Sequence, residues 1–174
     1  MTVKKNAQQL IDYTIANLGM MGQLAAHFHL EIQERYRDPI GAHIRHIIEH
    51  YETLIFKRSS QINYDTRQRD ISLEENPVEA ENRLAALSEY LHNVTLYELD
   101  DLVSVSSAGG LFGEVAFINQ SSVGRELCFL NSHAIHHLAI IKPACKQLGI
   151  PLDEYFGFAS STVAHLESQK MEVL

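Results

Sequence analysis

The stretch that decides the fold is residues 121–149, SSVGRELCFLNSHAIHHLAIIKPACKQLG. Its apolar residues recur at steps of three, four and seven residues, which is the spacing of one buried helix face. They are Leu127, Leu130, Ala134, Ile141 and Ala144. A serine at the start can cap a helix, and Gly149 followed by Pro151 is a strong stop signal. The pattern predicts a helix that begins at Ser121 or Ser122 and ends at Leu148.

Three other stretches show the same helical spacing, over residues 7–29, 38–58 and 76–94. Each of the last two starts with a residue that can cap a helix, Asp38 or Asn76, and a proline follows it directly. Proline suits the first helical position, because the N–H that it lacks would have no partner there. Four helices of this length predict an all-α fold, a four-helix bundle.

The connections between these helices suggest the order in which they pack. Residues 59–75 are polar and read as a loop, whose extended reach is roughly 56 Å. A 20-residue helix is only about 30 Å long, so this loop can cross the bundle and place helix 76–94 parallel to helix 38–58. The resulting path is up-down-down-up. Residues 97–120 alternate around Gly109 and Gly110, which predicts a small β-hairpin. The tail, residues 155–174, is expected to hold a short C-terminal helix packed on the bundle.

Composition limits the class of protein. The 174 residues suit one domain, residues 1–174, and 45% hydrophobic with 21% charged residues is typical of a globular chain. A net charge of −8 does not favour a nucleic acid or an anionic membrane as partner. No secretory signal and no apolar run near 20 residues is visible. We therefore expect a cytoplasmic protein with reduced core thiols at Cys128 and Cys145 and with small-molecule partners.

Six of the ten histidines fall into two groups. One is His43, His46 and His50; the other is His133, His136 and His137. Spacings of three, four and seven place each group on one side of its helix. Two imidazoles four residues apart can chelate a metal ion, and a third from another helix completes a three-His site. Such a site leaves a coordination position open, as catalytic metals need. The alternative is a set of buried imidazoles without metal, in which each unpaired polar group costs roughly 1–3 kcal/mol.

The helical wheel ranks these histidines. His133 and His137 fall within the apolar face of their helix, and His136 lies at its margin. On the other helix, His43 and His50 lie nearer the apolar centre than His46 does. Periodicity alone therefore favours His50 or His43 as the third ligand.

Two segments carry a resemblance to a known family. Residues 40–52, IGAHIRHIIEHYE, are similar to an I-G-x-Φ-Φ-x-H segment (Φ is apolar), and residues 132–141, SHAIHHLAII, contain H-x-x-H-H. In these motifs the chain resembles the DinB-like (DinB/YfiT-like) superfamily of metal-binding four-helix bundles. By position, the resemblance implies His46, His133 and His137 as metal ligands. We follow it on His46 against the wheel, because a ligand at the edge of an apolar stripe can face an open cleft.

The resemblance also implies a chemistry. Family members include thiol-dependent S-transferases, a thiol-dependent maleylpyruvate isomerase and proteins described as metal-dependent hydrolases. It implies one divalent ion, nickel or zinc, that activates a bound thiol or water. We therefore expect a metal-dependent transferase that uses a low-molecular-weight thiol, or a hydrolase at the same site. His50 is the expected catalytic residue, since an imidazole can accept and return a proton near neutral pH.

Two other functions stay open. A haemerythrin-like carrier would need a second metal and bridging carboxylates, but Glu49 and Glu52 point away from the apolar stripe. The other is a degenerate family member whose main role is to form a homodimer. Further candidates are five loop residues that either line a cleft mouth or form a solvated charged loop, Tyr64, Asp65, Arg67, Arg69 and Asp70. Arg125 and Glu126 form either a structural ion pair or a substrate contact, and Glu89 with His92 is expected to be a surface pair.

Overall fold

The protein is described here by a computed structural model, which covers residues 2–29, 33–56, 61–94 and 96–172. This part of the chain is mainly helical and carries a small three-stranded sheet. The helices are α1 (Thr2–Ala26), α2 (Gln33–Tyr36), α3 (Ala42–Ile55), α4 (Ile71–Glu75), α5 (Pro77–Asn93), α6 (Val123–Gln147) and α7 (Ser160–Glu172). A wider helical turn, η1 (Arg37–Gly41), precedes α3, and a tighter one, η2 (Leu96–Asp100), precedes β2. The strands are β1 (Gln61–Asn63), β2 (Leu102–Gly109) and β3 (Val115–Ser122).

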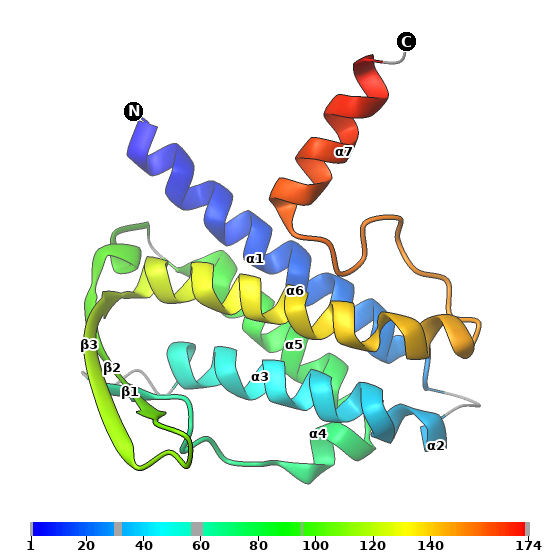
Figure 1. Ribbon diagram of the computed structural model, residues 1–174, viewed down its shortest axis with the longest axis horizontal. Coiled ribbons are helices and arrows are strands. Elements are labelled where there is room, and N and C mark those ends of the chain that lie inside the picture. Colours follow the sequence, from blue (N-terminus) through cyan, green and yellow to red (C-terminus); the bar gives the residue numbers. More distant parts are fainter. Residues whose placement is uncertain (1, 30–32, 57–60, 95, 173–174) are drawn as a thin grey trace.

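The four long helices α1, α3, α5 and α6 enclose the core. Helix α1 packs against α5 and α6, and α3 packs against α5 and α6. In Figure 1, α1 and α6 run in one direction and α3 and α5 run in the opposite one. Each contributes fully buried side chains to a single apolar cluster, among them Leu18, Ile44, Leu87 and Ala134. This packing places one face of α3 directly beside one face of α6.

Capping residues start two of these helices where the sequence predicts. The Asn76 side chain accepts hydrogen bonds from the backbone N–H groups of Val78 and Glu79, and Pro77 occupies the first turn of α5. The Ser122 hydroxyl accepts a hydrogen bond from the Arg125 N–H at the start of α6. Both caps satisfy N–H groups that have no partner inside the helix.

The helix expected over residues 38–58 is shorter than the prediction. Asp38 has extended backbone angles (φ −128°, ψ 121°), as its predicted place at the start of this helix requires. The wider turn η1 follows, and the regular α-helix α3 begins at Ala42. The proline ring disfavours helical angles in the residue before it, which explains the extended angles of Asp38. Helix α3 ends at Ile55, and the predicted end at residue 58 lies outside the described residues.

The connection over residues 59–75 is not the plain loop that was predicted. It contains β1, in which the buried Ile62 pairs with Val105 of β2, and it contains α4. The carboxylate of Asp70 caps α4 by accepting a hydrogen bond from the Ser72 N–H. A three-residue strand and a five-residue helix are too short to leave a clear periodic signal in a polar sequence.

The predicted hairpin is confirmed as the antiparallel pair of β2 and β3, which runs from Leu102 opposite Ser122 to Gly109 opposite Val115. Gly110 adopts φ +85° in the connecting turn, a conformation that other residues rarely adopt. Strand β1 adds to β2 in parallel, so β2 is central and the sheet order is β1-β2-β3. The sheet lies at the end of the molecule where α6 begins (Figure 1).

The C-terminal helix forms and contacts α1 at its first turn, where the Ser160 hydroxyl donates to the Tyr13 hydroxyl, but it does not pack on the other helices along its length. Most α7 side chains are exposed, and Figure 1 shows α7 projecting away from the other helices. The thiol prediction holds for Cys145, which is buried, whereas Cys128 is exposed. None of the helices in the described ranges combines the length and the apolar character that a membrane crossing requires.

Candidate metal centre

Helices α3 and α6 bring the two groups of histidines together. His46 Nε2 lies 2.9 Å from His133 Nε2, and His137 Nε2 lies 3.2 Å from the same atom of His133. His46, His50 and His133 each offer a ring nitrogen, and these three nitrogens lie within 4.8 Å of one another. The tertiary structure therefore gathers all four histidines that the sequence singled out as metal ligands or as the catalytic residue.

His43 and His136, the other two histidines of these groups, differ in their position relative to the cluster. His43 joins the cluster at its edge, where its Nδ1 lies 2.6 Å from Nδ1 of His137. His136 is exposed and meets only the edge of the His137 ring, with 5.6 Å between the ring centroids. The apolar wheel placed His136 at the margin for the same reason, since its side chain leaves α6 on the solvent side.

Hydrogen bonds set the tautomer of His50. Its Nδ1–H donates to the backbone carbonyl of His46 at 2.7 Å, because a carbonyl oxygen can only accept. A neutral imidazole with its proton on Nδ1 presents a free electron pair at Nε2. Metal-binding histidines are commonly held in this way, through a backbone carbonyl on the nitrogen away from the metal. His50 is therefore oriented as a ligand.

His46 is held in the opposite tautomer. The Arg67 NH2 group lies 2.8 Å from its Nδ1, and a guanidinium group has no acceptor, so Arg67 donates to that nitrogen. The proton of a neutral His46 then lies on Nε2, the nitrogen that faces His133. Coordination through Nε2 requires this proton to leave, and the contact with Arg67 opposes that change.

The cluster is electrically neutral at physiological pH. Burial is the largest cause that lowers the pKa of His46 to about 2, of His50 to about 4 and of His137 to about 3. Burial also lowers the pKa of His133 and of His43. Neighbouring imidazoles and Arg67 add to the effect by repelling a second positive charge. Metal ions bind the neutral imidazole, so these shifts favour coordination, although the ring proton of His46 must also leave Nε2.

A buried ion-pair network holds Arg67 in place. Its Nε lies 3.3 Å from Oε2 of Glu49, and its NH1 donates to the backbone carbonyl of Tyr64. Glu49 also lies 3.6 Å from NH1 of Arg45 and accepts a hydrogen bond from the Asp70 N–H. Glu49, judged by the sequence to point away from the apolar face, is 4% exposed beneath the loop that carries Arg67. Its spacing of four from Arg45 was the available signal.

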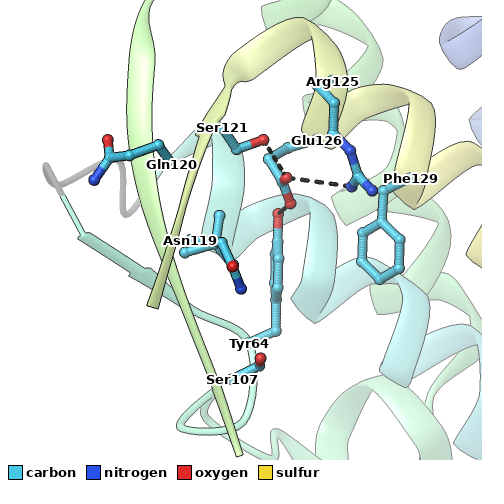
Figure 2. Close-up of a pocket in the computed structure, with 9 residues that line it drawn as sticks. Tyr64, Ser107, Asn119, Gln120, Ser121, Arg125, Glu126 and Phe129 are labelled. Atoms are coloured by element: carbon cyan, nitrogen blue, oxygen red, sulfur yellow. Dashed lines mark hydrogen bonds and ion pairs between the residues drawn. The ribbon is translucent and has the colours of Figure 1, made fainter. Parts of the chain in front are cut away.

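Two aromatic rings close one side of the cluster. The Tyr64 ring stacks on His50 (centroids 5.4 Å apart, interplanar angle 16°), and the Phe129 ring stacks on His133 (5.6 Å, 18°). Tyr64 belongs to the loop that the sequence placed at a cleft mouth, whereas Phe129 was not predicted. Both rings line a pocket with a volume of about 310 Å³. Figure 2 shows them beside the other lining residues.

The donor set fits a nickel or zinc ion. Imidazole nitrogens suit both metals, and bonds of about 2.0–2.1 Å in tetrahedral geometry put two ligand nitrogens roughly 3.3 Å apart. The observed separations of 2.9 and 3.2 Å around His133 are close to that value. A second, bridged metal has no such support, because Glu49 and Glu52 are engaged by arginines. Glu89 and His92 are exposed, as a surface pair should be.

Comparisons with known proteins give one informative relative. The chain is 34% identical over 108 residues, or 62% of its length, to "FK506-binding protein 5" of Rhizopus delemar. The chain spans about 28% of the length of this curated relative. No protein-family model matches the chain. No solved structure matches it significantly either.

This relative contradicts the function expected from the sequence. It is named for binding FK506, and its name denotes neither a metal-dependent S-transferase or hydrolase nor a metal or oxygen carrier. The expectation of a thiol-dependent transferase or hydrolase was therefore wrong, together with its carrier and degenerate-dimer alternatives. It had been drawn from the short histidine motifs on two helices, whereas the relative matches over 108 residues.

Proposed function

We propose that this chain binds one divalent metal ion, nickel or zinc, at the cluster of His46, His50, His133 and His137. The observation that carries the proposal is the convergence of three imidazole nitrogens within 4.8 Å, contributed by two helices. The lowered pKa values support it, because they keep the rings neutral at pH 7. A bound ion would supply a Lewis-acid charge.

His133 is the central ligand in this proposal, since its Nε2 lies within 3.2 Å of nitrogens from both His46 and His137. Elemental analysis of protein purified without chelator should find one ion per chain. His133→Ala should remove most of the metal, because the His133 ring is the one that lies close to both His46 and His137. His136→Ala is the matched control and should keep the ion, since His136 is exposed on the same helix. Full occupancy in His133→Ala, or wild-type protein that takes up neither metal, contradicts the proposal.

The same measurement ranks His46 and His50. The resemblance favours His46 as ligand, and the carbonyl-bound tautomer favours His50. Metal content in His46→Ala and His50→Ala, measured side by side, distinguishes the two. The catalytic role expected for His50 depended on the abandoned transferase or hydrolase function, so we propose His50 only as a ligand.

We also propose that the helical body is a DinB-like four-helix bundle. The directions of α1, α3, α5 and α6 in Figure 1 support the up-down-down-up path, and the long connection between α3 and α5 supports the crossover. A solved structure of this chain, compared with bundles of that superfamily, tests the assignment. The single-domain organisation and the cytoplasmic location stay predictions of the sequence.

The relative suggests a second candidate function, the binding of FK506. Identity of 34% over 108 residues supports it. The aligned segment is 28% of the relative, so the alignment leaves open which part of that protein binds the compound. Calorimetric titration of this chain with FK506 tests the candidate directly. Saturable binding supports it, and no binding at micromolar protein contradicts it.

A further inference from the structure

The pocket in Figure 2 lies between the sheet and the first turns of α6. Strands β2 and β3 form one wall, and α6 forms the other with Arg125, Glu126 and Phe129. Tyr64 stands between them, and its ring and that of Phe129 separate the pocket from His50 and His133. A volume of about 310 Å³ is at the small end of the range for small-molecule sites.

The acidic group in this pocket is already satisfied. Glu126 is 3% exposed, and its Oε2 accepts a hydrogen bond from the Tyr64 hydroxyl at 3.0 Å. Its Oε1 accepts from the Ser121 hydroxyl at 2.6 Å and lies 3.4 Å from NH1 of Arg125. Burial raises the pKa of the Tyr64 hydroxyl, which therefore stays protonated and remains a donor. These contacts use the carboxylate oxygens, so Glu126 offers little to a cationic ligand.

The Arg125 guanidinium can donate further hydrogen bonds to a ligand. Its side chain is 65% exposed, its single contact with Glu126 is long, and its guanidinium lies 5.7 Å from the centroid of the Phe129 ring. A guanidinium has five N–H donors in a planar fork that matches a carboxylate. The Phe129 ring beside it is 38% exposed and offers an apolar surface. The Asn119 side chain faces Tyr64 from the opposite wall and adds an amide (Figure 2).

We propose that this pocket binds a small aromatic carboxylate. The acid group pairs with the Arg125 guanidinium at the mouth, and the ring lies against Phe129 and Tyr64. The rings of Tyr64 and Phe129 then lie between the bound molecule and the imidazole cluster. Binding at Arg125 does not require a metal ion, so this inference stands apart from the function proposed above.

A charge series of probes tests the proposal. Benzoate, benzamide and benzylamine share one ring and differ in charge, and each is titrated by calorimetry into the purified protein. We expect benzoate to bind about tenfold more tightly than the other two, since a charge-assisted pair with arginine is stronger than a neutral hydrogen bond. Benzoate and benzamide binding equally, benzylamine binding more tightly, or no benzoate binding at millimolar concentration would each overturn it.

Variants locate the site. Arg125→Gln should weaken benzoate binding about tenfold, which is the loss of one charge-assisted contact. Arg37→Gln is the matched control, because Arg37 is also well exposed (61%) and also pairs with glutamates. It lies in η1, before the N-terminal end of α3, and does not line the pocket. Unchanged benzoate binding in Arg125→Gln, with an unchanged melting temperature, would contradict the proposal.

The titration is repeated after metal removal with neutral 1,10-phenanthroline and dialysis, because a carboxylate chelator would compete for the site. Benzoate binding should persist. Its loss would show that the probe binds a metal ion, and would refute the pocket assignment while supporting the metal centre.

Discussion

Arg67 and the two histidines of α3 show how single hydrogen bonds control a ligand set. His50 donates its Nδ1–H to a backbone carbonyl and exposes Nε2, whereas His46 accepts from Arg67 and carries its proton on Nε2. Arg67 itself is tied to Glu49 and is 14% exposed at its side chain. Its positive charge and its donated hydrogen bond both oppose a cation bound at His46.

Arg67→Met should therefore tighten zinc binding. Removal of the donor frees the Nδ1 of His46 to carry the ring proton, which leaves Nε2 available as a ligand. One hydrogen bond of this kind is worth about 1 kcal/mol, so we expect roughly a fivefold gain in affinity. Competition with a fluorescent zinc chelator measures it. Arg69→Met is the control, because Arg69 is exposed on the same loop. Weaker binding in Arg67→Met would mean that the arginine supports the ligand set.

The start of α5 shows how an element is defined by one side chain. Asn76 has extended backbone angles (φ −119°, ψ 101°) and accepts hydrogen bonds from two N–H groups of the first turn. Those N–H groups have no partner inside the helix, so the cap satisfies them. Helix α5 in turn covers α1 and α3 with its buried leucines.

Asn76→Ala should lower the free energy of unfolding by about 1 kcal/mol, the usual loss for an N-cap. Urea denaturation followed by circular dichroism measures the change. Asn76→Asp retains an acceptor oxygen at the cap and should stay within a few tenths of a kcal/mol of the wild type. A loss of the same size in both variants would attribute the effect to something other than capping.

At the scale of the whole molecule, the buried and half-buried imidazoles of the cluster couple folding to pH. The pKa of His50 is about 4 in the folded chain, against an ordinary value of 6.5, and the pKa values of His46 and His137 are lower still. Between these values and pH 6.5 the unfolded chain binds protons that the folded chain does not. The unfolding free energy therefore falls as pH drops below 6.5 and is highest above it.

Metal-free protein should accordingly lose stability between pH 6.5 and about pH 4 while it remains folded at pH 7.5. Urea denaturation at several pH values measures the slope. His50→Gln removes one of the groups and should flatten this slope, whereas His92→Gln, at an exposed position of α5, should leave it unchanged. A flat profile in the wild type would show that the cluster is already solvated.

Local sequence signals determined much of the helical framework. The caps at Asn76 and Ser122, and the stop at Gly149, act on N–H groups and angles within a few residues. The wheel placed His133 and His137 on the buried side of their helix for the same local reason. The extended angles at Asp38 agree with its predicted place as a cap before Pro39, whereas the short helix α2 before it was not predicted.

Only the tertiary structure decided what those helices bring together. The parallel pairing of Ile62 with Val105 and the contact of Arg67 with His46 join residues far apart in the chain. Phe129 reads as one more apolar residue in the sequence, and it becomes the wall between pocket and cluster through stacking on His133. Periodicity reports which side of an element is buried. It carries no information on the partner that buries it, because that partner is chosen by the packing of the whole chain.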